Sequence, residues 1–429
     1  MKKIIILIFI LCFSSVSMSQ SNETIEVSLD QVVGKISNEN LTVYESALRV
    51  YQTKESITFA RMNLLPRLNL WKLASSAVEI FAGGPVGVAS GAFSIVEDIA
   101  PFVVPANWFR VSQAKLFYKA DLEGYRALWG NEVLTAKSLY FHLLLDTSLL
   151  EHIKKSRKDL NEIYSIVKVR ETFGGASITV SQEIKQRLLA LDEDTRAIEV
   201  LIAEEESLLA FMMGYETGVR LKAKQIKLPD YDSLSQLNYE DFVFRAVDES
   251  PEIRQFDHLI EASKYARKEV QYAFLGASSL SRGLTGGVFD NLPVQPGLGF
   301  GTAASLRIVR SQKEILKVQQ KAVKETVKRH LKLLVNNYNL DLSNYRNINQ
   351  RVYLASSSLN NMYNRLRLGE EVDSLALIEA SRNYIEADTS LFAVMYRFLS
   401  SEDKLSRMIF HGDYAHSREA VEKVKGTHL

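Results

Sequence analysis

Residues 334–362, LVNNYNLDLSNYRNINQRVYLASSSLNNM, decide the fold of this 429-residue chain. Mostly apolar residues recur there at alternating spacings of four and three, and Asp341 occupies one of these positions. A mean spacing of 3.5 residues is the heptad of left-handed coiled coils. The row is Leu334, Tyr338, Asp341, Tyr345, Ile348, Val352, Ala355, Leu359 and Met362. The stretch therefore predicts a long helix that packs against another helix along one seam.

The same pattern occurs 195 positions earlier, in residues 139–167. Its row is Leu139, Leu143, Asp146, Leu150, Ile153, Arg157, Leu160, Tyr164 and Val167. The offset places Asp146 on Asp341 and Gly174 on Gly369. A heptad pattern that continues for about four heptads and occurs twice favours an internal duplication of the chain. An ordinary pair of buried helices is the alternative.

Each repeat is expected to form a long helical hairpin. Residues 106–228 and 297–429 contain no proline, so helices of about sixty residues are permitted, and these would be about 90 Å long. Return helices are expected after the tip glycines, over 177–213 and 373–410. A shorter helix precedes each hairpin, and residues 28–64 align with 238–274 at an offset of 210.

The domain limits follow from these patterns. Lys2 and Lys3 precede the apolar run 4–13, and small residues follow it, which predicts a signal peptide over 1–19. The first structural repeat then covers 20–237, with a polar linker at 214–237. The second repeat covers 238–412, and residues 413–429 are expected to form a flexible C-terminal tail.

Two extended segments interrupt the helices. Residues 297–308 alternate between apolar residues and small or polar residues, which fits a tilted strand of an outer-membrane barrel. Their partner is 272–284, and 67–77 with 90–104 are the counterparts, so strand pairs are expected at about 67–105 and 272–308. Four strands cannot close a barrel, and lipid does not tolerate open edges. Several protomers would therefore have to share one barrel.

Two segments carry a resemblance to a known family. Residues 64–70 read Leu-Leu-Pro-Arg-Leu-Asn-Leu at the end of the opening helix, and 363–412 have a tip glycine followed by a return helix that ends in a Leu-rich turn and a glycine. In both respects the chain resembles the TolC family of outer-membrane efflux proteins. Glu379 and Ala380 stand where that family usually has Asp-Ala, and the usual Gly-Gly-x-Arg turn is absent after 105 and 308.

The resemblance implies a fold and a set of partners. The expected fold is mainly α with a small β part: duplicated long antiparallel hairpins form a periplasmic α-barrel, and four strands per protomer share a trimeric 12-stranded β-barrel. The implied function is that of an outer-membrane channel of a tripartite efflux or type I secretion system. The implied partners are two further copies of the chain, outer-membrane lipid, a periplasmic adaptor protein and an inner-membrane pump. The protein would lie in the outer membrane and extend into the periplasm.

Composition excludes several other classes. The 52 basic and 51 acidic residues give a net charge of +1, which argues against a nucleic-acid binder. Cys12 is the single cysteine, so a cysteine-based zinc site, a disulfide framework and a thiol nucleophile are all unexpected. No two histidines have the i, i+4 spacing of a helical metal site, and no phosphate-binding glycine loop is present. The sequence therefore predicts no enzyme, no metal and no cofactor, and acidic runs such as Glu204–Glu206 are interpreted as solvated helix faces.

Charged residues supply the candidate functional sites. A basic stripe includes Arg310, Lys313, Lys317, Lys321, Lys324 and Lys328. It fits a solvated face, a lumen lining or a contact with anionic lipid head groups. Pore and gate candidates at the hairpin tips are Gly174, Arg365, Arg367, Gly369, Glu370, Glu371, Asp373 and Glu379. A solvated loop is the alternative for the tips; the hypothesis is that arginine–carboxylate contacts between hairpins latch the periplasmic end.

The acidic seam pair and the function remain open to alternatives. Asp146 and Asp341 are expected to face the aqueous lumen or to pair across the barrel, because a charge in an apolar row costs stability. Besides a channel, two other functions fit the pattern: a periplasmic coiled-coil adaptor or scaffold without a barrel, and a TolC-like outer-membrane protein that does not conduct.

Overall fold

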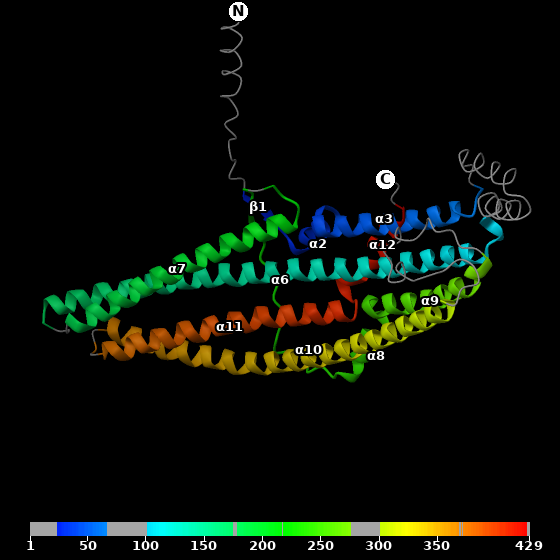
Figure 1. The fold of residues 1–429 in the computed structure, drawn as a ribbon. Coiled ribbons are helices and arrows are strands. Elements are labelled where there is room, and N and C mark those ends of the chain that lie inside the picture. The colour runs from blue at the N-terminus through cyan, green and yellow to red at the C-terminus, as the bar shows by residue number, and fades with distance from the viewer. Residues whose placement is uncertain are drawn as a thin grey trace, which may run out of the picture. The chain divides into compact units, whose positions relative to one another are not determined.

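The computed structural model describes residues 24–66, 101–174, 178–216, 218–275, 301–368, 370 and 372–426. The predicted signal peptide and most of the two predicted strand pairs, residues 67–100 and 276–300, lie outside this part of the chain. Most of the described residues are helical (Figure 1).

The two halves of the chain contain helices of matching length. The first half consists of β1 (Thr24–Val27), α2 (Leu29–Glu39), α3 (Leu41–Met62), a 3₁₀ turn (Pro101–Val103), α6 (Pro105–Thr172), α7 (Ile178–Met212) and β2 (Arg220–Ala223). The second consists of α8 (Glu240–Glu249), α9 (Pro251–Tyr272), a 3₁₀ turn (Ala273–Leu275), α10 (Thr302–Arg367), α11 (Ser374–Met408), a 3₁₀ turn (Gly412–His416) and α12 (Ser417–Gly426). α3 and α9 both have 22 residues, and α7 and α11 both have 35. α6 has 68 residues and α10 has 66, so both hairpins are built on helices of the expected length.

The opening segment of each repeat is two helices and not one. The Asn40 side chain accepts a hydrogen bond from Val43 N at 2.9 Å, and the Ser250 side chain accepts one from Ile253 N at 3.4 Å. Such a side-chain cap satisfies an amide that the first turn of a helix leaves unpaired. Pro251 then occupies the first position of α9, which proline favours. The prediction of single helices over 28–64 and 238–274 was therefore wrong.

The chain divides into two compact units, each of which draws on both repeats. Unit 1 contains residues up to Ile36, Ala136–Tyr231 and Tyr345–Tyr396. Unit 2 contains Ser37–Thr135, Asp232–Asn344 and the residues from Arg397 onward. The units differ from the repeats because α6 and α10 each contribute one portion to unit 1 and another to unit 2.

Unit 1 is organised around the seams of the two hairpins. α7 returns along α6, and α11 returns along α10 (Figure 1). One apolar cluster joins all four helices: Ile153, Leu160, Ile163, Val167, Ile184, Leu188, Leu191, Leu366 and Leu377. Every position of the two predicted heptad rows is buried or half-buried except Arg157. Arg157 is exposed and pairs with Asp192 on α7.

A small sheet in unit 1 was not predicted. β1 and β2 pair in parallel, with Thr24 opposite Arg220 and Val27 opposite Ala223. The Tyr140 hydroxyl is buried at the end of this sheet, 2.6 Å from Lys224 O and 3.1 Å from Val27 O. Burial raises the pKa of Tyr140 to about 12. Part of the predicted 214–237 linker is thus a strand that α6 holds in place.

Unit 2 gathers the helix ends that border residues 67–100 and 276–300. Ala60 and Leu64, at the end of α3, pack against Val111 and Ala114 of α6. A second cluster joins α6, α9 and α10 through residues that include Val104, Leu116, Ala266, Val270, Val309 and Leu316. Two apolar clusters therefore link these helix ends, and the beginning of α6 contributes to both.

The described ends of the predicted strand pairs are not strands. Residues 302–308 belong to α10, Tyr272 to α9, and 101–103 form a 3₁₀ turn. Within α10, Ser305 and Val309 are buried on one face, four positions apart, and Ser305 N donates to Gly301 O at 2.9 Å. This burial recurs after four residues, as on one face of a helix, whereas Ala304 and Ile308, which the alternation placed on the apolar face of a strand, are exposed. The prediction that a strand continues to residue 308 was wrong.

The C-terminal tail is ordered through residue 426. Tyr414 is fully buried, and its hydroxyl donates to Asp403 at 2.7 Å. Ser417, at the start of α12, is also fully buried and accepts from Arg126 Nε at 3.0 Å. The expectation of a flexible tail over 413–429 was therefore wrong for 413–426, because this segment completes the core of unit 2.

Candidate gate, seam and basic residues

Asp341 is buried within the chain and paired with an arginine. It is 5% exposed, and Arg397 Nε of α11 lies 2.9 Å from its Oδ1. Burial raises the pKa of Asp341, and Arg397 opposes part of that rise. Within one chain, Asp341 is therefore buried and forms an ion pair with the neighbouring helix. This differs from the expectation that its carboxylate faces the lumen.

Asp146 has a different environment at the matching position. It is 9% exposed, and burial raises its pKa, with His142 opposing part of the rise. Glu205 of α7 faces it: burial, and then the charge of Asp146, raise the pKa of Glu205 to about 7. Glu205 Oε2 is buried and has no hydrogen-bond partner among the described residues. Two carboxyl groups thus meet at the first seam, where the second has an ion pair.

The half-buried position of Glu205 was not predicted, because Glu204–Glu206 were interpreted as a solvated helix face. Glu205 and Glu206 are half-buried, and burial raises the pKa of both. A signal was present in the sequence. The 4,3 spacing of the return helix runs from Ser181 through Ile184, Leu188, Leu191, Thr195, Ile198 and Ile202 to Glu205 and Leu209. Extending the heptad along that helix predicts burial for Glu205 but not for Glu204.

The second hairpin tip contains the predicted arginines. Arg365 Nε lies 2.7 Å from Glu370 Oε2, and both side chains are about half exposed. The Arg367 guanidinium lies 4.7 Å from the centre of the Tyr363 ring. The Tyr363 hydroxyl in turn donates to Glu162 Oε2 of α6 at 2.8 Å. Within one chain, Arg365 therefore pairs inside its own tip, and Arg367 stacks on the residue that links α10 to α6.

The remaining tip candidates have local structural roles. Asp373 Oδ1 accepts from Leu375 N at 3.0 Å at the start of α11. Glu379 Oε1 lies 3.9 Å from Nη2 of Arg382, one turn further along α11. Gly174 has a positive φ of 73°, which favours glycine after the end of a helix. Gly369 and Glu371 lie outside the described residues.

The basic stripe on α10 separates into three kinds of residue. Lys317 and Lys328 pair with acidic residues one turn earlier, Glu314 at 2.9 Å and Glu325 at 3.0 Å. Arg310 and Lys313 line a groove that α10 forms with α9. Lys321 and Lys324 form no ion pair within the described residues.

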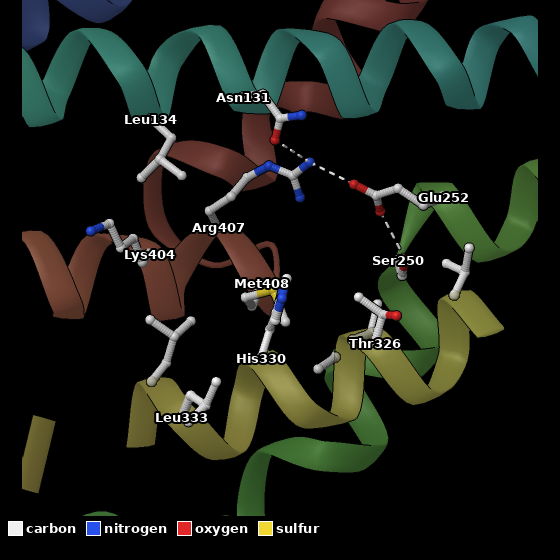
Figure 2. Close-up of a pocket in the computed structure, with 14 residues that line it drawn as sticks. Asn131, Leu134, Ser250, Glu252, Thr326, His330, Leu333, Lys404, Arg407 and Met408 are labelled. Carbon is white, nitrogen blue, oxygen red and sulfur yellow. Dashed lines mark hydrogen bonds and ion pairs between the residues drawn. The ribbon is translucent and has the colours of Figure 1, made fainter. Parts of the chain in front are cut away.

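A separate cavity of about 550 Å³ lies in unit 2 between α6, α8, the start of α9, α10 and α11. Figure 2 shows Arg407 at its edge, between Asn131 and Glu252. One Nη of Arg407 donates to Glu252 Oε1 and Asn131 Oδ1, both at 2.9 Å, and to Ala127 O at 3.0 Å. Arg407 is 5% exposed, so this contact network is a fixed part of the unit 2 core.

Among the described residues, no group of three or more His, Cys, Asp and Glu side chains is placed to hold a metal ion. None of the helices in this part of the chain combines the length and apolar character needed to cross a membrane.

The comparisons with known proteins give a fold. The sequence matches no protein-family model and no curated protein. A membrane protein from Pseudomonas aeruginosa is similar in structure, with a TM-score of 0.70 at 12% identity over 93% of this chain and 94% of that chain. The CmeC outer membrane channel of Campylobacter jejuni gives 0.68 at 12% identity, over 92% and 89% of the two chains.

A third solved structure agrees with these two. The outer membrane protein VceC of Vibrio cholerae gives a TM-score of 0.68 at 12% identity, over 90% of this chain and 96% of that chain. The likeness spans nearly the whole length of each pair of chains. The long-helix fold expected from the resemblance to TolC-family channels is therefore confirmed.

Proposed function

We propose that this chain is one protomer of a trimeric outer-membrane channel, the passive exit duct of a tripartite efflux or type I secretion system. The observation that carries the proposal is the full-length likeness to solved bacterial membrane proteins, among them the CmeC outer membrane channel, which covers at least 89% of either chain in the pairs compared. An adaptor that shared only a helical hairpin with these channels would align over a fraction of its length. No catalytic role is part of the proposal.

The bordering helix ends support a shared barrel. Residues 67–100 follow α3 and residues 276–300 follow α9, and each of these helices packs against the beginning of α6 in an apolar cluster of unit 2. Two strand pairs that start at one place can form adjacent parts of a single sheet. Four strands from one chain leave open edges in lipid, so the proposal requires three chains that share a 12-stranded barrel.

The partners and location follow from the same proposal. The barrel would lie in the outer membrane, and the hairpins of unit 1 would extend into the periplasm. Their tips would meet a periplasmic adaptor, and through it an inner-membrane pump. These partners rest on the resemblance to TolC-family channels, and the fold is what supports that resemblance.

Membrane fractionation and planar-bilayer recording test the proposal together. The tagged full-length chain should be recovered in the outer-membrane fraction and should give discrete conductance steps after detergent extraction and insertion into a bilayer. Recovery as a soluble periplasmic protein without detergent would overturn the proposal in favour of an adaptor or scaffold. Recovery in the outer membrane without conductance would overturn the proposal that the chain forms an exit duct, and would favour a non-conducting outer-membrane protein.

A further inference from the structure

A basic groove of about 640 Å³ lies between α9 and the beginning of α10. Figure 1 shows α9 alongside this part of α10. Six cationic side chains line the groove, against the single carboxylate of Glu314. They are Lys264, Arg267 and Lys268 of α9 with Arg307, Arg310 and Lys313 of α10.

The protein provides the cations of the groove with little counter-charge: Glu314 interacts electrostatically with Arg310 and Lys313, and Lys268 lies over the Phe109 and Tyr265 rings. Within the described residues none of the six forms an ion pair. Glu314 is already engaged by Lys317 at 2.9 Å, and the nearby Glu269 is engaged by Arg110 at 2.6 Å. Like charges that converge on one groove repel each other unless an anion is bound there. The arrangement therefore stabilises a ligand with concentrated negative charge.

The chemistry of the lining selects phosphate among anions. Arginine guanidinium groups bind phosphate oxygens through two parallel hydrogen bonds, and lysine adds a compact charge. Gln271 provides a neutral amide at the same groove, and Leu306 and Val309 provide an apolar wall. A phosphate attached to an apolar body matches both kinds of lining.

The position of the groove favours a lipid as the source of that phosphate. Its lining comes from the last turns of α9 and the first turns of α10, next to residues 276–300. Exposed aromatic side chains occur at the start of α6 and the end of α9, which border residues 67–100 and 276–300: Phe102 (52%), Trp108 (53%), Tyr272 (43%) and Phe274 (46%). Aromatic side chains with one apolar and one polar end are enriched at membrane–water interfaces.

We propose that this groove binds the phosphate headgroup of an anionic phospholipid at the periplasmic surface of the outer membrane. The proposal rests on the proposed function, since it requires residues 276–300 to enter that membrane. It assigns Arg267 of α9 and Arg307 and Arg310 of α10 to the phosphate, and it gives the other residues of the basic stripe on α10 no such role.

Native mass spectrometry of the full-length protein tests the assignment. The detergent-extracted protein is titrated with phosphatidylglycerol, phosphatidylcholine or inorganic phosphate. The groove variant Arg267→Gln/Arg307→Gln/Arg310→Gln is compared with wild type. An attraction of about fivefold per basic residue predicts a loss of about 100-fold in phosphatidylglycerol affinity for the triple variant.

The matched control removes the same charge elsewhere on α10. Lys321→Gln/Lys324→Gln/Arg329→Gln also removes three positive charges, but none of these residues lines the groove. The control should keep wild-type affinity within about threefold. If the groove triple fails to fold, as judged by circular dichroism, Arg267→Gln and Arg310→Gln are measured singly, and each should lose about fivefold.

Three results would overturn the lipid assignment. Equal losses in the two triple variants would indicate general charge attraction. Equal affinity for phosphatidylcholine would exclude recognition of net negative charge. Inorganic phosphate that binds as tightly as phosphatidylglycerol would identify a soluble anion as the ligand. Fractionation of the wild type is an independent measurement: outer-membrane recovery without lipid selectivity rejects this inference alone, whereas recovery outside that membrane rejects the proposed function.

Discussion

Replacing Gly130 with alanine is expected to destabilise the protein, although alanine favours a helix more than glycine does. A Cβ added at Gly130 in α6 would lie 2.6 Å from Arg407 Nε, 3.0 Å from its Cδ and 3.1 Å from its Cζ. Arg407 has little freedom to move away. Its guanidinium is buried, bonded to Asn131 and Glu252, and lies 4.5 Å from the centre of the Phe410 ring.

The expected change in the free energy of unfolding is the balance of a stabilising and a destabilising contribution. Alanine gains about 1 kcal/mol over glycine inside a helix. Forcing an additional methyl into a packed site costs about 1–3 kcal/mol. If Arg407 shifts to relieve the contact, each charged hydrogen bond that breaks costs about 1.5–3 kcal/mol. The expected net loss for Gly130→Ala is about 1–2 kcal/mol.

Denaturant unfolding of the full-length protein in detergent measures this change against two matched glycines. At Gly124 the nearest atom to an added Cβ is Gln255 Nε2 at 3.2 Å, the end of a flexible side chain, and at Gly34 nothing lies within 4 Å. Both alanine variants should be neutral or gain up to about 1 kcal/mol.

An Arg407→Ala background supplies the mutant cycle. There the contact is absent, so Gly130→Ala should become stabilising. Gly130→Ala that is as stable as Gly34→Ala in the wild-type background would refute the packing that the structure assigns to Arg407.

Three further changes test the seams and the tip. Glu205→Gln should weaken the pH dependence of folding stability. The pKa of Glu205 is raised from 4.5 to about 7, so between these pH values the folded state holds a proton that the unfolded chain releases. Wild-type stability should therefore fall by about 1–3 kcal/mol as pH rises from about 4.5 to 7, as measured by urea unfolding at several pH values. Arg397→Gln should cost about 1–2 kcal/mol in the same assay, because it leaves buried Asp341 without its partner, and Asp341→Asn should cost less. Arg365→Gln/Arg367→Gln should raise resting conductance in bilayer recordings, more strongly at low salt, where charge contacts are least screened.

Each of these expectations has a contrary outcome. An unchanged pH slope in Glu205→Gln would show that other groups carry the titration. A larger loss for Asp341→Asn than for Arg397→Gln would show that the carboxylate has partners beyond this arginine. Equal conductance of the wild type and the tip double variant across the salt range would show that apolar packing near Leu366 and Leu377 holds the tip closed.

The long hairpins were predictable because one physical pattern is repeated many times. The 4,3 rows continue without proline, and the structure buries or half-buries their members, including Asp146 and Asp341. Heptad position places these two carboxylates in the seam, where the structure buries them, whereas their charge led to the expectation that they face the lumen or pair across the barrel. The partner of Asp341 does not follow from heptad position, because Arg397 reaches it from an exposed position on α11. Long charged side chains choose partners by local geometry, which spacing does not encode.

Short-range patterns were less informative. The alternation at 302–308 suits a strand, yet these residues form the first turns of α10, with Ser305 and Val309 inward. β1 and β2 pair residues that are almost two hundred positions apart, and four-residue strands carry too little pattern to predict. Tyr414 is likewise buried by contacts with distant helices, which a short terminal segment does not reveal.

The number of chains in the detergent-extracted particle tests the central claim most directly. Four strands in one chain require partners to close a barrel, so a native mass measurement combined with negative-stain imaging should give an elongated particle of three copies. A monodisperse monomer that retains its helical circular dichroism would contradict the proposal that three chains form one channel.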